Sequence, residues 1–465
     1  MFPKPAGPAK DLDHLYLTLR PEPLIEPEEF RLFYRPQVNA VRGEDTVGRL
    51  ATKLRQAFGA VPLKTFVMGH PGVGKSTEIS RLLTQVDSQF VGVRLSIATE
   101  LNPASFKVFD VLLLMLAGVA AEAERLGAAP LTGIHLTNLF VDIQQWFGIE
   151  QVKETGTRTI GAGVEVGAGV KEGSPWAALL GLFASAKAEM KYASERKTEF
   201  VEYRLRKVSD LVGICNKLLE ACSDALKERR KKEWLLVIED LDKTGISPAQ
   251  LQELFIQYGN VFQNLHVSMI FTIPVWLAYS PEANRLPFDR YMIHDTPVFD
   301  RKHGAHEQGR EAVEEVLKAR VSQTLFADQQ MTRLVVASGG NLRDLFALVL
   351  DGGEGALAKD PIAAAVGTQE AGAAINKMRR EYRMKLGQSP YDAEQIPYSD
   401  KLARLLAVYH DKPDHGIPDK VLYSLLRARA VQEFNGEGWF GVHPLVVDIL
   451  KEQGHLKPQD PGGTN

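Results

Sequence analysis

Residues Gly69 to Thr77 read GHPGVGKST, and the mostly apolar run LKTFVM at Leu63 to Met68 stands directly before them. The first eight of these residues match G-x-x-x-x-G-K-[ST], a loop that cradles the phosphates of a nucleoside triphosphate. Its glycines let backbone N–H groups turn toward phosphate oxygens, and the following helix points its positive dipole end at the same place. An apolar strand before the loop and an amphipathic helix after it predict an α/β fold with a parallel sheet, and make a chance match in a surface turn the weaker interpretation.

The residues of this loop have different expected roles. We expect Lys75 to reach the β- and γ-phosphates, the hydroxyl of Ser76 to ligate Mg²⁺, and Thr77 to continue into the helix. The predicted cofactors are therefore ATP and Mg²⁺. The residues expected to bind them are Gly69, His70, Pro71, Gly72, Val73, Gly74, Lys75, Ser76 and Thr77.

A second part of the predicted site lies far downstream, where the apolar run Trp234 to Ile238 ends in Glu239-Asp240-Leu241-Asp242. A continuous apolar run is typical of a central parallel strand, whose carboxyl end faces the ligand in open α/β sheets. We assign Glu239 to magnesium and Asp240 to orienting or activating the attacking water. Because Asp240 is one methylene shorter than a glutamate, we expect slow hydrolysis. An acidic strand end in a solvated loop is the alternative interpretation.

Two further polar residues follow in the order that a nucleotide switch requires. Thr272 lies near the end of the apolar run His266 to Pro274 and is expected to reach the γ-phosphate or its water. Arg343 lies in the first turn of a helix opened by Gly339-Gly340-Asn341, a good helix start. Each is a weak signal by itself, since a strand threonine and a surface arginine are common.

Together these motifs and the Leu-Lys-Ala-Arg segment at Leu317 to Arg320 resemble AAA+ ATPases, in particular the replication-initiator and STAND-like branches. The resemblance covers about 35–125, 233–350 and the tail from 396. It implies an ATPase with a helical lid, a winged-helix domain and an arginine finger that reaches a neighbouring subunit. The implied roles are Walker A at Gly69 to Ser76, Walker B at Glu239 and Asp240, sensor 1 at Thr272, sensor 2 at Arg343, and a finger at either Arg290 or Arg285.

The composition is that of an ordinary globular chain long enough for two or three domains: 465 residues, 45% hydrophobic and 24% charged. The net charge of −3 gives no general attraction to nucleic acid or anionic membrane, so DNA contact would need a local patch. Cys215 and Cys222, about 10 Å apart on one expected helix, are too distant for a disulfide. Without a signal core or a run of roughly 20 apolar residues, we expect a cytoplasmic protein with no membrane span.

The chain is expected to divide into an N-terminal arm (1–34), a nucleotide-binding core (35–302), a helical lid (303–395) and a winged-helix domain (396–465). The core carries an insertion at about 127–232. That insertion contains a Gly-rich alternating stretch, an apolar segment from Trp176 to Ala184 that we expect to be buried, and one long helix from about Ser194 to Arg230, of which part is expected to project or to pack on a partner. Residues Asp351 to Gly355 are expected to form a loop.

The C-terminal domain is expected to contain helices at Asp400 to Tyr409 and Asp419 to Ala428, a hairpin at Val431 to Val442, and a closing helix at Pro444 to Lys451. Arg427 and Arg429 lie at the end of its second helix, whereas the hairpin tip carries Glu437. The sequence leaves open whether this domain contacts DNA or protein.

The leading hypothesis is an ATP-binding and ATP-hydrolysing switch that forms a homo-oligomer and signals to an effector protein. The resemblance to STAND-like proteins suggests a role in bacterial phage defence. The alternative is an ATP-dependent DNA-binding initiator or transposition regulator. A third reading is a scaffold that binds ATP and hardly turns it over, and a small-molecule kinase ranks last because it needs no sensor-arginine lid.

Overall fold

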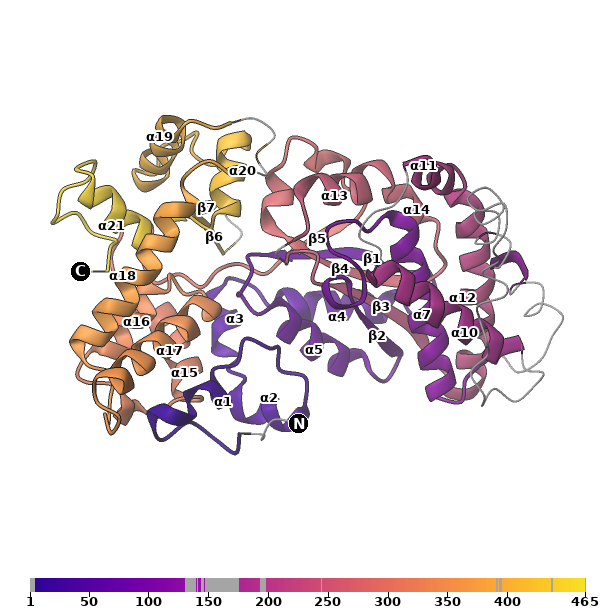
Figure 1. Cartoon of the computed structure of the whole chain (residues 1–465), viewed down its shortest axis with the longest axis horizontal. Coiled ribbons are helices and arrows are strands. Elements are labelled where there is room, and N and C mark those ends of the chain that lie inside the picture. Colours follow the sequence, from indigo (N-terminus) through magenta and orange to yellow (C-terminus); the bar gives the residue numbers. More distant parts are fainter. Residues whose placement is uncertain are drawn as a thin grey trace.

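The computed structural model describes residues 5–129, 139, 141–143, 146, 175–192, 198–243, 245–389, 392, 395–435 and 438–464. A five-stranded sheet lies at its centre, with all paired strands parallel (Figure 1). The strand order is β2-β3-β4-β1-β5, so β1 lies inside the sheet with its carboxyl end between neighbours. The strands are β1 (Lys64–Gly69), β2 (Phe90–Ser96), β3 (Glu233–Glu239), β4 (Ser268–Pro274) and β5 (Asp289–Met292).

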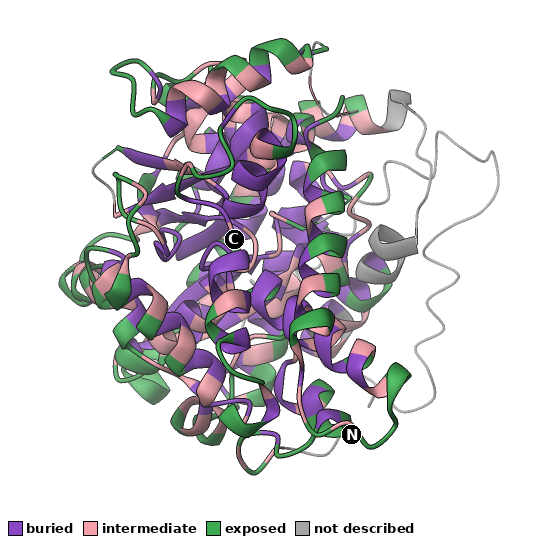
Figure 2. Cartoon of the chain, turned by 90° about the vertical axis from the view of Figure 1, so that its left-hand side faces the viewer, coloured by how far each residue is buried: buried purple, intermediate pink, exposed green. Residues whose placement is uncertain are grey.

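Helices cover both faces of this sheet, which explains why the central strands read as continuous apolar runs. On one face, α4 (Thr46–Ala57) and α5 (Lys75–Val86) share a core with Val67, Leu235 and Ile270. The adjacent residues of the same strands point to the opposite face, where α7 (Val108–Arg125) packs on β2. Figure 2 shows the buried residues gathered on the strands and on the helix surfaces that face them. The fold is therefore an α/β core of the P-loop type with a parallel sheet, as predicted.

Within the insertion, the structure corrects one prediction and confirms another. The expected single long helix is two helices, α11 (Thr198–Arg206) and α12 (Val208–Arg230), because Lys207 between them leaves the helical conformation. The apolar stripe of α12 is buried in the chain's own core rather than projecting. The segment after Trp176 forms α10 (Pro175–Tyr192), which packs on α7 and is buried as expected. The Gly-rich alternating stretch lies outside the described residues.

The arm and the lid pack together beside the core, as Figure 1 shows for α1, α2 and the lid helices. The expected loop at Asp351 to Gly355 is wrong, because α17 (Leu342–Lys359) continues through it. Gly352 and Gly353 are needed there for close packing: a Cβ on Gly353 would lie 2.4 Å from Cδ1 of Leu15 in the arm. The arm contains η1 (Leu12–His14), α1 (Leu15–Thr18) and α2 (Pro27–Phe33), and α3 (Gln37–Val41) follows at the start of the core. The elements of residues 303–395 are α15 (Glu307–Lys318), η6 (Gln323–Leu325), α16 (Gln330–Ala337), α17 and α18 (Thr368–Lys385).

The C-terminal unit, residues 395–464, forms two helices, a two-stranded antiparallel hairpin and a closing helix. These five elements lie within a residue or two of their predicted bounds. They are α19 (Tyr398–Tyr409), α20 (Lys420–Arg427), β6 (Val431–Phe434), β7 (Trp439–Val442) and α21 (Pro444–Glu452). The remaining short elements of the core are α6 (Ile97–Glu100), α13 (Pro248–Gln252), η3 (Glu253–Gln257), α14 (Gly259–Gln263), η4 (Val275–Tyr279) and η5 (Ala283–Arg285).

Both cysteines are free thiols buried in the core, as expected, and burial raises the pKa of each. Among the described residues, no helix is long and apolar enough to cross a membrane.

Candidate nucleotide-binding site

An open cleft lies at the carboxyl end of the sheet, where ligands bind in open α/β folds. Its cavity volume is about 400 Å³, within the roughly 300–1,000 Å³ of most ligand pockets. The N-terminal arm forms one wall and is fastened to the phosphate loop, since the backbone N–H of Leu24 donates to Oγ1 of Thr77 over 3.2 Å. The cleft is lined by Arg20–Ile25, Gly72, Gly74–Thr77, Arg94–Ser96, Glu100, Glu239, Asp240, Asp242, Lys243, Arg320, Leu342, Arg343 and Phe346.

Two positions of the loop, Gly72 and Gly74, require glycine for different structural reasons. Gly72 has φ +93°, and a Cβ there would lie 2.3 Å from Oδ1 of Asn341. Gly74 has φ +98° but nothing within 4 Å of its Cβ position, so its constraint is backbone conformation rather than space. Gly74 is also the N-cap of α5, and no side chain caps that end. The first N–H groups of α5 are therefore directed at the cleft, an arrangement suited to binding an anion.

Lys75 is buried at the base of the loop and has three partners. Its ammonium donates to the carbonyl oxygens of Gly69 and His70, over 2.9 and 3.0 Å, and forms an ion pair with Asp242 with Nζ and Oδ2 2.6 Å apart. Sequence reasoning gave Asp242 no role. The one sequence signal that could have indicated a role for Asp242 was its position three residues after Glu239, at the acidic end of the same strand.

Glu239 ends β3 and faces the start of α5. Its carboxylate pairs with Arg94 of β2 over 2.6 Å, a partner that the sequence did not reveal because 145 residues separate the two. Burial raises the pKa of Glu239, while Arg94 and the neighbouring Ser76 hydroxyl act to lower it. Oε1 of Glu239 is buried and lacks a hydrogen bond of good geometry. That atom and the Ser76 hydroxyl fit a magnesium ion, which takes few protein ligands and completes its shell with phosphate and water.

Asp240 adopts a left-handed backbone conformation with φ +67°, which is uncommon outside glycine but tolerated by aspartate and asparagine. Its Oδ2 accepts a hydrogen bond from Oγ of Ser96 over 2.5 Å, and Lys243 lies 3.4 Å from Oδ1. These contacts turn the Asp240 side chain toward the cleft beside Glu239.

Gly69, Pro71 and Val73 of the loop are not among the residues that line the cleft, and of the predicted residues outside the loop that remain, one lines it and three do not. Arg343 lines the cleft from the first turn of α17, next to Gly72. Thr272 is buried in β4 and is not among the lining residues. Arg285 at the end of η5 and Arg290 within the edge strand β5 are both exposed. The structure therefore does not separate these two arginines as finger candidates.

His70 connects the phosphate loop to the C-terminal unit. The ring is 2% exposed; Nδ1 faces Oδ2 of Asp295, and Nε2 lies 2.9 Å from the carbonyl oxygen of Leu426 at the end of α20. Each ring nitrogen thus faces an oxygen that accepts hydrogen bonds. Although burial alone would raise it, the pKa of Asp295 is lowered by His70, and also by Arg42 and Gln432. His70, which the sequence assigned to nucleotide binding, thus connects the loop to the C-terminal unit of the same chain.

Further hydrogen bonds connect the phosphate loop and the C-terminal unit through the start of α17. The side chain of Asn341 caps α17 and donates to the carbonyl of Pro71 over 2.9 Å, while Gln432 of β6 donates to the carbonyl of Gly339 over 2.9 Å. Arg429, just after α20, pairs with Asp344 over 2.8 Å. The phosphate loop, the helix that carries Arg343 and the C-terminal hairpin are therefore held in one polar network.

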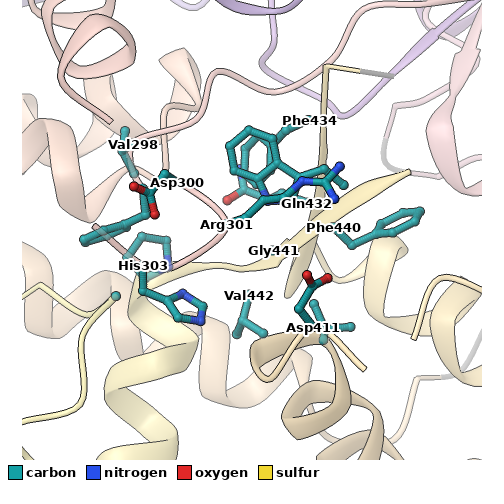
Figure 3. A pocket seen from close by; sticks show the side chains of 15 residues that line it. Val298, Asp300, Arg301, His303, Asp411, Gln432, Phe434, Phe440, Gly441 and Val442 are labelled. Carbon is teal, nitrogen blue, oxygen red and sulfur yellow. The ribbon is translucent and has the colours of Figure 1, made fainter. Parts of the chain in front are cut away.

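A second, smaller cavity lies outside this polar network, between the turn at Val298 to His303 and the C-terminal hairpin (Figure 3). Aromatic side chains fill its walls, and the guanidinium of Arg301 lies over the ring of Trp439 with 5.8 Å to the ring centre. It contains none of the residues that line the nucleotide cleft. We regard it as part of the packing between the core and the C-terminal unit.

No family model and no curated protein matches the sequence. Among solved structures, the chain is similar to a Walker-type ATPase of Pyrococcus abyssi, with TM-score 0.39, 9% identity, and coverage of 93% of this chain and 99% of that one. It is also similar to the ORC1 protein of Aeropyrum pernix in complex with DNA, with TM-score 0.35, 13% identity, and coverage of 88% and 92%. At such values the fold assignment rests on the chain's own sheet and loop.

Proposed function

We propose that the protein is an ATP-binding and ATP-hydrolysing switch of the AAA+ type, with Mg²⁺ as the metal. The observation that carries this proposal is the convergence of Lys75, Ser76, Glu239 and Asp240 on one cleft, from segments more than 160 residues apart in sequence. A phosphate loop alone would serve many enzymes. Joined to a lid helix that brings Arg343 to the same cleft, it suits a protein that changes conformation with its nucleotide.

Within this function, each residue has a physical task. The N–H groups at the start of α5 and the ammonium of Lys75 would hold the phosphates. Ser76 and Glu239 would hold the metal, which neutralises charge on the phosphates when bound. Asp240 would accept a proton from the attacking water, and its short side chain suits slow turnover. Arg343 would bring the lid toward the phosphates.

The contacts of His70 support a route by which the nucleotide state reaches the C-terminal unit. Phosphate binding acts on a loop whose second residue already contacts Asp295 and the end of α20. A shift of that loop would act directly on how the unit docks. We propose that this unit, as a winged helix, passes the signal to an effector protein, and that a neighbouring copy supplies Arg285 or Arg290 as a finger.

The test is hydrolysis and assembly by the purified full-length chain. We expect slow release of phosphate from ATP that requires Mg²⁺, and a rise in mass when ATP and Mg²⁺ are added. Asp240→Asn should stop hydrolysis while nucleotide binding persists. Fast turnover of many ATP per second, or hydrolysis that survives this substitution, would contradict the assigned roles.

The alternative, an ATP-dependent DNA-binding initiator, would require the C-terminal unit to expose a DNA-binding surface. Its second helix, α20, packs on the core in this structure, where Tyr423 contacts the ring of Trp276. Arg429, just after this helix, is paired with Asp344 of α17. Reading DNA with this helix would require the unit to leave the core. Salt-dependent DNA binding that requires ATP would favour the initiator. A role in phage defence rests on the STAND-like resemblance, and the genes adjacent to this one would test it.

A further inference from the structure

We infer that Asp242 is a built-in counter-ion that competes with the phosphates for Lys75 and so sets the nucleotide affinity of the cleft. The inference rests on the proposed function and adds to it a positioning residue that no motif assigns. It is carried by one contact: the ammonium of Lys75 and the carboxylate of Asp242 lie 2.6 Å apart, with side chains 6% and 9% exposed.

The ammonium of Lys75 has no donor left for a phosphate in this arrangement. An ammonium has three N–H donors. Two of them point at the carbonyls of Gly69 and His70, inside the loop, and the third points at Asp242. The two carbonyls belong to the loop and move with it, whereas Asp242 lies on a different segment, three residues beyond the end of β3. Asp242 is therefore the partner that a phosphate oxygen would replace.

Burial makes this exchange energetically important. An ion pair in contact with solvent contributes little, but two charges with under a tenth of their side chains exposed are poorly screened. A carboxylate at this position holds Lys75 in the loop and also repels an incoming polyphosphate. Both effects lower the affinity for nucleotide, so a variant with a neutral side chain in place of Asp242 should bind nucleotide more tightly.

Asp242 also has a different partner from the two carboxylates assigned to the metal and to the attacking water. Glu239 is paired with Arg94, and Asp240 accepts a hydrogen bond from Ser96. Neither has an ion pair with Lys75. The three acidic residues at this strand end thus have separate partners, which predicts that their substitutions give separate effects.

The experiment titrates the purified full-length protein with a fluorescent ADP analogue, once with EDTA and once with Mg²⁺. Asp242→Asn removes the charge but keeps an oxygen that can accept from Lys75. The matched control is Asp87→Asn, which removes the same charge at an exposed position just beyond the far end of α5, about 18 Å along that helix. Thermal unfolding of each variant without nucleotide checks that it is folded.

We expect Asp242→Asn to bind the analogue five- to twenty-fold more tightly than the wild type in EDTA, and Asp87→Asn to change affinity less than two-fold. Unchanged or weaker binding by Asp242→Asn in EDTA, with a wild type that binds, would overturn the inference and leave the proposed function standing. Weaker binding only with Mg²⁺ would instead identify Asp242 as a metal ligand and would also overturn it. If neither protein binds, the proposed function and the inference both fail.

Discussion

Replacing His70 with alanine should loosen the C-terminal unit without unfolding the sheet. The ring is 2% exposed and contacts both Asp295 and the carbonyl of Leu426, so the substitution removes two buried contacts and leaves the buried Asp295 carboxylate without one of its partners. Breaking a buried pair in this way costs about 3–5 kcal/mol. Because Arg42 still acts on Asp295, we expect a somewhat smaller loss of stability, about 2–4 kcal/mol.

Hydrogen exchange is the suitable assay, because a chain of several units does not unfold in one step and local opening is the quantity that changes. A loss of 2–4 kcal/mol corresponds to exchange in α20 and β6 faster by a factor of about 30 or more, at roughly 1.4 kcal/mol for each tenfold change. Amides of β1 and β4 in the sheet should keep their protection. The control is His14→Ala, an exposed histidine of the arm.

A double-mutant cycle then separates the contact from general disruption. If His70 and Asp295 interact directly, His70→Ala combined with Asp295→Asn should cost about 2 kcal/mol less than the sum of the two single changes. Additive costs would refute the direct interaction. Unchanged protection of α20 in a folded His70→Ala protein would refute the idea that the phosphate loop fastens the C-terminal unit.

Three further predictions follow from individual residues. Asp240→Asn should keep the fold because asparagine accepts φ +67°, so circular dichroism should match the wild type while phosphate release falls at least 100-fold. Gly340→Ala should destabilise the chain by at least about 2 kcal/mol in denaturant unfolding, because Gly340 has φ +77° and the new Cβ would lie 1.9 Å from the carbonyl oxygen of Thr296. Burial lowers the pKa of His294 and of His443 to about 4, against 6.5 when unfolded, so the unfolded chain takes up these protons first as pH falls. Unfolding free energy should therefore drop between pH 7 and pH 5 by roughly 2 kcal/mol per histidine, and a variant with glutamine at both positions should show a flatter pH dependence.

Sequence reasoning was most successful where a residue's role depends on its near neighbours. The strand before the phosphate loop, the apolar run that ends at Glu239 and the C-terminal hairpin were all legible, because strand patterns and turn residues are local signals. The glycines at Gly352 and Gly353 misled for the same reason. In isolation they indicate a loop, but a Cβ on Gly353 would meet Leu15 of the arm and a Cβ on Gly352 would meet Val366, so the packing around α17 leaves no room for a side chain.

Pairings between distant segments were not predictable. Arg94 and Glu239 meet because β2 and β3 are neighbours in the sheet, an order that the sequence does not state. His70 was read as part of a nucleotide loop, and only the folded chain brings Leu426 to it, 356 residues later. The sequence therefore identified the groups assigned to the nucleotide, while the structure identified the protein groups that pair with them.

The central claim is that one cleft binds a triphosphate through Lys75. Calorimetric titration of the purified chain with ATP and Mg²⁺ tests it, with Lys75→Ala as the paired variant. The account predicts saturable binding of one nucleotide per chain, weakened at least tenfold in the variant. No binding of any nucleotide by the folded wild type, or equal binding by both proteins, would contradict it.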